Sequence, residues 1–296
     1  MVRLACTHCL RTNPRDGDGM IYIFRALMGI ACLAMGFLSP GPARAAEKVD
    51  LELVIATDMS YSIDEEEARL QREGVAAAFL SRGVIQAIRN GTHGRIAAAY
   101  IDFASTPYNV VVADWHVIRD RASANTFAEK LLKAPSNTGR HTSISSGMDM
   151  AAEMIQKNAF DGTRGVIDVS GDGPNNYERR VDIARDQIVA QGITINGLAI
   201  MNETDKHRSR YYLPDLDRYF EGCVIGGRGA FMLAATGFRD FARAMKKKLV
   251  LEIAGRALPQ NPRVMKAQFP GRGYAKGCDI GERMRGRSWG FSDDNP

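Results

Sequence analysis

The chain lacks an excess of basic charge in its central part. The formal net charge is +5, but residues 1–45 hold five basic and two acidic residues, and residues 255–296 hold eight basic and four acidic residues. The intervening segment, residues 46–254, has a net charge of −2. Domains that bind nucleic acid present a basic surface to the phosphate backbone. We therefore expect no nucleic-acid partner.

Apolar runs long enough to cross a membrane are also lacking. Residues 26–38 form a continuous apolar run of 13 residues, whereas a spanning helix needs about 20. Adding Met20–Phe24 would lengthen the run, but Arg25 would then lie inside the apolar segment, where a charge is costly. A membrane anchor is therefore not the favoured interpretation.

The same region has the layout of an export signal. A basic residue precedes the apolar run, and Ala43-Arg44-Ala45 supplies a small-x-small cleavage site. We expect residues 1–45 to be a signal region that starts at Met1 or at Met20 and is removed after Ala45. The mature protein would then be periplasmic or extracellular.

Cysteine is scarce, with five residues in the chain. Cys6 and Cys9 form a lone C-x-x-C upstream of the expected cleavage site, and the second ligand pair that a zinc site needs does not follow. The mature chain keeps Cys223 and Cys278. Two cysteines in an exported protein can pair, but Cys278 lies in a segment expected to be loose, so the sequence leaves both states open.

Apolar strands alternate with amphipathic helices along most of the chain. Strands are expected at 49–57, 95–104, 108–115, 164–170, 193–200 and 230–235, with helices between them. Such alternation is typical of a parallel sheet covered on both faces. The short break at Thr106-Pro107 indicates an antiparallel hairpin at one edge. The predicted fold is α/β: a three-layer, doubly wound, mostly parallel six-stranded sheet with helices on both faces and one antiparallel edge strand.

The expected domain covers residues 46–254. Beyond Gly255 the periodicity ends and Gly, Pro and Arg become frequent. Such a composition is typical of segments without a packed core. Residues 255–296 are therefore predicted to be a flexible basic tail, and its deletion is expected to leave the fold intact.

The segment Asp58-Met59-Ser60-Tyr61-Ser62 directly follows the first expected strand. One carboxylate and two hydroxyls at alternate positions place three oxygen ligands on one loop. The loop lies at the carboxyl end of a strand, where open α/β sheets bind ligands, and Mg²⁺ prefers oxygen ligands. Alone the pattern is weak, because Asp58 could be only a helix cap and the serines only turn residues.

Two later loops strengthen the prediction of a metal site. Thr142 lies in a polar loop that opens a helix, and Asp172 follows the fourth expected strand. Neighbouring parallel strands would bring these loops to one edge of the sheet. The expected ligands of Mg²⁺ or Mn²⁺ are Asp58, Ser60, Ser62, Thr142 and Asp172. Asp168, in the middle of its strand, is expected to be paired inside the protein instead.

In order and spacing, these three loops resemble the von Willebrand factor A (vWA) domain family. That family carries a metal-ion-dependent adhesion site (MIDAS) formed by D-x-S-x-S, a threonine in the next loop and an aspartate in the loop after that. The resemblance covers roughly residues 49–254 and is closest to a secreted, uncharacterised bacterial branch. It implies that the first four ligands contact the metal directly or through water, and that Asp172 binds through water.

The chain departs from the family pattern at two positions beside the expected metal. Gly171 stands where many members have threonine, and His141 stands where glycine is common. Neither change removes a ligand, but both reshape the loops next to the metal. We therefore consider His141 and Gly171 as residues that could contact a partner, although a solvated loop histidine is the favoured interpretation of His141.

Two functions are compatible with such a site. In a binding module, the metal keeps an open position for an acidic side chain of a partner protein. A metal-dependent hydrolase or phosphotransfer enzyme is the alternative, and it usually needs a base or nucleophile and often a second metal. The sequence has no H-E-x-x-H motif. We favour an exported, non-enzymatic binding module without a small-molecule cofactor, whose partner has an exposed acidic residue.

Overall fold

A seven-stranded sheet forms the centre of the protein in a computed structural model, which describes residues 45–136, 138–203, 206, 209–255, 264–266 and 273–287. The strand order is β4-β3-β2-β6-β7-β8-β9. The strands are β2 (Glu52–Asp58), β3 (Ile96–Phe103), β4 (Val110–Ile118), β6 (Gly165–Gly171), β7 (Thr194–Ile200), β8 (Phe231–Ala235) and β9 (Val264–Lys266). The two edge strands, β4 and β9, are antiparallel to their neighbours, and the other pairs are parallel.

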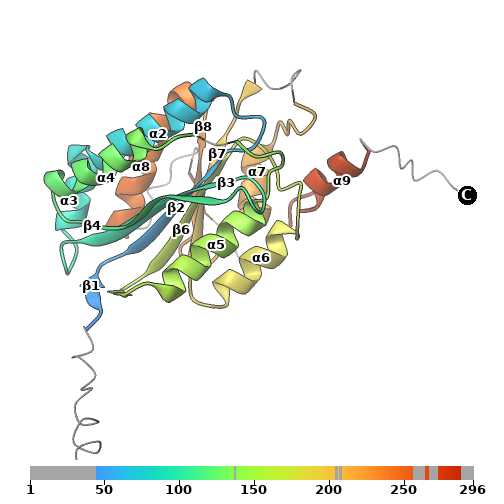
Figure 1. Cartoon of the computed structure of the whole chain (residues 1–296). Helices are drawn as coiled ribbons and strands as arrows, with labels where there is room; N and C mark the ends of the chain where they lie inside the picture. Colours follow the sequence, from blue (N-terminus) through green and yellow to red (C-terminus); the bar gives the residue numbers. More distant parts are fainter. Residues whose placement is uncertain are drawn as a thin grey trace, which may run out of the picture. The chain divides into compact units, whose positions relative to one another are not determined.

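Helices cover both faces of this sheet (Figure 1). One face packs against α2 (Glu65–Phe79), α3 (Arg82–Arg89), α4 (Arg121–Lys133) and α8 (Phe238–Ala254). The other packs against α5 (Ile144–Lys157), α6 (Val181–Val189), α7 (Leu216–Tyr219) and the π-helix η2 (Phe220–Val224). Every residue of β2 and β3 is buried, as expected for central strands covered on both faces. Burial of these strands fixes the carboxyl end of β2, where Asp58 lies.

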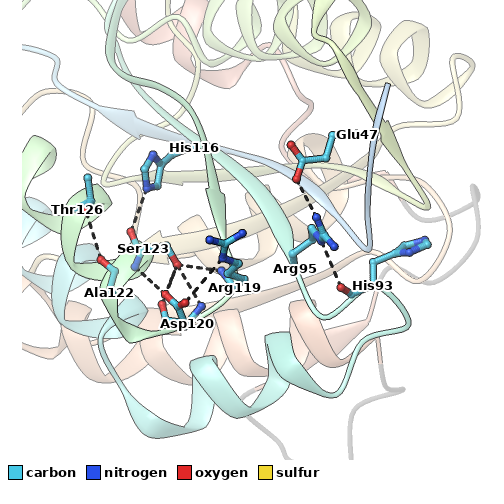
Figure 2. Close-up of polar contacts among 9 residues, drawn as sticks. All are labelled: Glu47, His93, Arg95, His116, Arg119, Asp120, Ala122, Ser123 and Thr126. Atoms are coloured by element: carbon cyan, nitrogen blue, oxygen red, sulfur yellow. Dashed lines mark hydrogen bonds and ion pairs between the residues drawn. The ribbon is translucent and has the colours of Figure 1, made fainter. Parts of the chain in front are cut away.

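Local hydrogen bonds determine where several elements begin. Helix α4 starts at a capping box, in which Ser123 N donates to Asp120 Oδ1 (2.8 Å) and Asp120 N donates to Ser123 Oγ (3.1 Å) (Figure 2). The ring of His116 on β4 lies 3.1 Å from the Ser123 carbonyl oxygen and joins the strand to the helix. A short two-stranded sheet, β1 (Glu47–Val49) with β5 (Phe160–Gly162), lies beside the main one. Arg95 anchors β1 through an ion pair with Glu47 (3.0 Å).

The predicted architecture is confirmed, with additions that the periodicity does not reveal. All six expected strands are present, and β4 forms the expected antiparallel edge. The sheet has a seventh strand, β9, because three residues of the segment after Gly255 pair with β8. Three residues are too few to produce a recognisable alternation. The same length explains why β1 and β5 were not predicted.

The segment after Gly255 differs from the expected flexible tail where the structure describes it. Cys223 and Cys278 form a disulfide with a Cα–Cα distance of 5.5 Å. Tyr274 and Cys278 are each only 9% exposed and belong to the core on the α5 face. A further helix, α9 (Ile280–Arg287), follows directly. Composition alone predicted a loose tail. The disulfide that orders this segment joins cysteines that are distant in sequence, and it leaves no local sequence pattern.

Asp168 is paired inside the protein, as predicted. Lys248 Nζ on α8 lies 2.6 Å from Asp168 Oδ2 and 3.5 Å from Glu252 Oε1, and all three side chains are fully buried. Burial of opposite charges requires such mutual pairing. Asp168 is therefore paired with Lys248 on the α8 face of the sheet and does not belong to the predicted metal site.

The expected export signal lies outside the described residues, which begin at residue 45. Among the helices that the structure does describe, none has both the length and the apolar character needed to span a membrane.

Candidate metal centre

Asp58 is the last residue of β2 and is fully buried between β3 and β6. Ser60 N donates a hydrogen bond to Asp58 Oδ1 (2.8 Å). The other carboxylate oxygen, Oδ2, has no hydrogen-bond partner among the described residues. Burial raises the pKa of Asp58 to about 7. The hydrogen bonds from Ser60 lower this pKa, but their effect is smaller than that of burial. A buried carboxylate oxygen without a partner is costly, and a cation or a proton at this position would satisfy it.

The two serines connect Asp58 to Asp172. The Ser60 and Ser62 hydroxyl oxygens lie 3.2 Å apart. Ser62 Oγ in turn donates to Asp172 Oδ1, also over 3.2 Å. Four of the five predicted ligands are thus joined by a continuous series of polar contacts, although 110 positions separate Ser62 from Asp172 in the sequence.

Thr142 is brought to this cluster by the loop that precedes α5. Gly139 N donates to the Met59 carbonyl oxygen (2.9 Å), which pairs this loop with the Asp58–Ser62 loop. A Cβ on Gly139 would lie 2.5 Å from Ala104 Cβ, so the close approach requires glycine. The loop is also bound to Asn176, because Thr142 N donates to Asn176 Oδ1 (3.1 Å) and Asn176 N donates to the Thr142 carbonyl (2.8 Å).

A cavity of about 300 Å³ opens above these side chains. Ser60, Ser62, Thr142 and Asp172 line it, whereas Asp58 is fully buried and is not part of the lining. The remaining lining residues are Tyr61, Arg140, Gly173, Asn176, Ser209, Arg210, Tyr211 and Tyr212. The loops at the ends of β2 and β6 therefore meet at an accessible, oxygen-rich hollow.

The donor set fits a hard divalent cation. It offers two carboxylates and three hydroxyls, and the described residues contain no group of three His, Cys, Asp or Glu side chains arranged for a metal. Mg²⁺ and Mn²⁺ accept oxygen ligands and keep several waters when the protein supplies few carboxylates. The unpaired Asp58 Oδ2 and the hydroxyl cluster are the features that such an ion would satisfy. All five predicted ligands converge here, and their role as ligands remains a proposal.

The two residues considered for partner contact do not line the cavity. His141 stacks on Tyr177 with ring centroids 4.5 Å apart and is not part of the cavity lining. A Cβ on Gly171 would lie 3.2 Å from Asp58 Oδ2, so this glycine allows close packing against the carboxylate. The structure therefore places both residues beside the site and neither of them in the cavity wall.

Residues that the sequence analysis missed hold the third loop in place. Asn175 is fully buried, and its Oδ1 accepts from Ser145 N of α5 (3.1 Å). Its Nδ2 donates to Glu282 Oε1 of α9 (2.7 Å). Helix α9 therefore supports the loop that carries Asp172. The consecutive amides Asn175-Asn176 close to Asp172 were a signal for this role, but no sequence signal pointed to Glu282.

The raised pKa of Asp58 predicts a pH dependence of metal binding. The carboxyl group is protonated in the folded state below a pKa of about 7, so the metal-free protein loses stability as the pH rises through that value and the buried group ionises. A metal binds only the ionised form. We expect the apparent affinity for Mg²⁺ to rise about tenfold between about pH 6 and pH 8. Calorimetric titrations at several pH values measure this, and a flat profile would contradict it.

The sequence matches a family described as "Protein of unknown function (DUF1194)" over residues 48–257. The chain belongs to this family. The match covers the main sheet from β2 to β8 and all three loops of the candidate metal centre. None of the curated proteins matches the sequence.

Several solved structures are similar to the DUF1194 chain. Proximal thread matrix protein 1 (PTMP1) from the mussel byssus is 15% identical over 71% of this chain and 49% of that chain, with a TM-score of 0.50. The pilus adhesin SpaC from Lactobacillus rhamnosus GG is 13% identical over 71% of this chain and 32% of that chain, with a TM-score of 0.51. A von Willebrand factor type A protein from Catenulispora acidiphila is 14% identical over 70% of this chain and 43% of that chain, with a TM-score of 0.48.

At these identities the comparisons show the fold alone. The fold is that of a vWA-like domain, as the resemblance in the sequence implied. The chain spans about half the length of the mussel protein and about a third of the adhesin. The activities and partners of those proteins are therefore not established for this chain.

Proposed function

We propose that this DUF1194 protein is an exported, adhesion-type module that binds a partner protein through Mg²⁺ or Mn²⁺. The ion would be held by Asp58, Ser60, Ser62 and Thr142, with Asp172 acting through water. A carboxylate of the partner would complete the coordination of the ion. The single observation that carries the proposal is the fully buried Asp58 Oδ2, which has no hydrogen-bond partner among the described residues and whose carboxylate is linked through two serines to a second carboxylate.

The chemistry of the cavity favours binding over hydrolysis. Among the described residues that line it there is no histidine, cysteine or lysine, and Asp172 is the only carboxylate. A metal-dependent hydrolase usually needs a base or nucleophile beside the ion. The names of two proteins with a similar fold, a pilus adhesin and a thread matrix protein, agree with a role in adhesion.

Capture from a cell-envelope extract tests this function. Wild-type protein with about 1 mM Mg²⁺ is expected to retain a partner that is released by a chelator. Asp58→Ala should retain none, because the metal loses its buried anionic ligand. Asp114→Ala removes an exposed carboxylate on β4 that does not line the cavity, so this variant should bind like the wild type. Equal capture by all three proteins with and without the chelator would refute the proposal.

Export is the second part of the proposed function. We expect the protein recovered from its own cells to begin at Ala46, because Ala43-Arg44-Ala45 follows the apolar run at residues 26–38. N-terminal sequencing of the protein from separated cell fractions measures this. An uncleaved chain in the cytoplasm would show that the segment is not a signal.

A further inference from the structure

Two guanidinium groups lie at the rim of the cavity beside the candidate metal. Arg140 comes from the loop before Thr142, and Arg210 comes from the segment between β7 and α7. Both side chains are exposed, and neither forms an ion pair with a residue that the structure describes. Their charges are therefore available to a ligand that enters the cavity.

Counted over the described residues alone, the charge of the site is positive once a divalent ion is bound. The cavity lining contains two arginines and one carboxylate, that of Asp172, and the Asp58 carboxylate is buried outside the lining. A divalent cation and two guanidiniums exceed these two carboxylates by two charges. One carboxylate from a partner would neutralise only half of that excess. Charge complementarity across an interface contributes to specificity and to the rate of association.

The other wall residues indicate that the ligand is a polypeptide. Tyr61, Tyr211 and Tyr212 also line the cavity, and Tyr61 is 84% exposed. Tyrosine and arginine are enriched in protein–protein interfaces, and lysine is depleted. The lining has three tyrosines and two arginines, and no lysine among its described residues. A small inorganic anion would leave the tyrosine rings without a contact, whereas a peptide chain would cover them.

We propose that the cavity rim docks a segment of a partner protein that carries two carboxylates. The first carboxylate completes the coordination of the metal, and the second pairs with Arg140 and Arg210. The intervening backbone and side chains pack on the tyrosines. This inference rests on the proposed metal-dependent function and adds the chemical class of the partner.

Synthetic peptides test the second carboxylate directly. The probes are glycine peptides with two aspartates separated by one to five glycines, and each has a counterpart with one aspartate replaced by asparagine. They are titrated onto the full chain as recovered from cells, with saturating Mg²⁺. We expect at least one two-aspartate peptide to bind about tenfold more tightly than its counterpart, as a charge-assisted hydrogen bond would provide.

Variants of the rim identify the residues responsible. Arg140→Gln and Arg210→Gln should each reduce the advantage of the two-aspartate peptide, and the double variant should abolish it. Arg82→Gln is the matched control, because Arg82 is an exposed arginine on α3 outside the cavity. An advantage that persists in the double variant, or that Arg82→Gln also removes, overturns the proposal.

The failure of this inference is distinguishable from the failure of the metal-binding function. If Mg²⁺ raises the melting temperature and one-aspartate peptides bind equally well, the metal site stands and the second carboxylate is refuted. If inorganic phosphate displaces the best peptide at equal concentration, the site recognises phosphoryl groups and the proposal is overturned. If neither metal nor peptide has an effect, both proposals fail together.

Discussion

Asp58→Ala is expected to abolish the rise in melting temperature that Mg²⁺ or Mn²⁺ gives the wild-type protein. A ligand that binds only the folded state stabilises it by about 2.7 kcal/mol at a hundredfold excess over its dissociation constant. For a domain of this size that corresponds to a rise of about 5–10 °C. Asp58 supplies a fully buried anionic oxygen that lacks a hydrogen-bond partner among the described residues. Without Asp58, only the carboxylate of Asp172 and the hydroxyls of Ser60, Ser62 and Thr142 would be left to bind the metal.

The metal-free variant should still be folded. Asp58 contributes no apolar packing that a methyl group would leave empty, and burial of its carboxylate is itself unfavourable and raises its pKa to about 7. The cost of the substitution is the hydrogen bond from Ser60 N. Asp58→Asn retains an acceptor for that bond and removes the charge, so it separates loss of the metal from loss of structure.

Asp172→Asn provides a graded comparison. If Asp172 acts through water, the variant should weaken metal binding less than Asp58→Asn does. Asp114→Asn, on the exposed strand β4, should leave the metal-induced shift unchanged. A wild-type protein without any shift at millimolar Mg²⁺ or Mn²⁺ would show that these oxygens do not form a metal site. Differential scanning fluorimetry of the wild type and the four variants, with and without metal, decides between these outcomes.

The loops that carry the proposed ligands were predictable because each loop has a local sequence pattern. Asp58 and Asp172 each end a buried strand, and the parallel arrangement of those strands places both ends at one edge of the sheet. The hydroxyls of Ser60 and Ser62 are fixed by their spacing from Asp58 within the same loop. Strand periodicity and short motifs were therefore sufficient to predict both the fold and the residues that converge.

The rim and the supports of the site were not predictable in the same way. Arg210 and Glu282 reach the site from segments whose position depends on long-range contacts. His141 was considered as a partner contact because it lies next to the site in sequence, and the structure stacks its ring on Tyr177. Adjacency in sequence does not fix the direction of a side chain in a loop. The order of the segment after Gly255 depends on a covalent bond between distant cysteines.

Deletion of residues 256–296 is now expected to lower the stability of the protein, contrary to the expectation from sequence alone. The deletion removes the Cys223–Cys278 bond, which closes a loop of 55 positions. Loss of a native disulfide typically costs about 2–5 kcal/mol, which corresponds to a fall in melting temperature on the order of 10 °C. The deletion also exposes the core surface that Tyr274 covers. Thermal melts of the full-length and truncated proteins measure the difference.

The same deletion should weaken metal binding, because the supported loop carries Asp172. Glu282 Oε1 on α9 accepts a hydrogen bond from Asn175 Nδ2, and a Cβ on Gly281 would lie 2.0 Å from the Asn175 carbonyl oxygen. The helix backbone therefore packs directly on the loop. Without it, Asp172 and Asn176 would be less restrained, and we expect the affinity for Mg²⁺ to fall several-fold as the loop pays ordering entropy on binding.

Two variants separate the disulfide from the helix. Cys278→Ser removes the covalent bond but leaves α9, whereas Glu282→Ala leaves the bond and removes the contact with Asn175. Cys278→Ser should reproduce most of the loss of stability, and Glu282→Ala should reproduce most of the loss of metal affinity. Glu282→Gln is the matched control, because its amide oxygen can still accept from Asn175. Equal metal affinity in the wild type and in Glu282→Ala would show that α9 stabilises the domain without positioning Asp172.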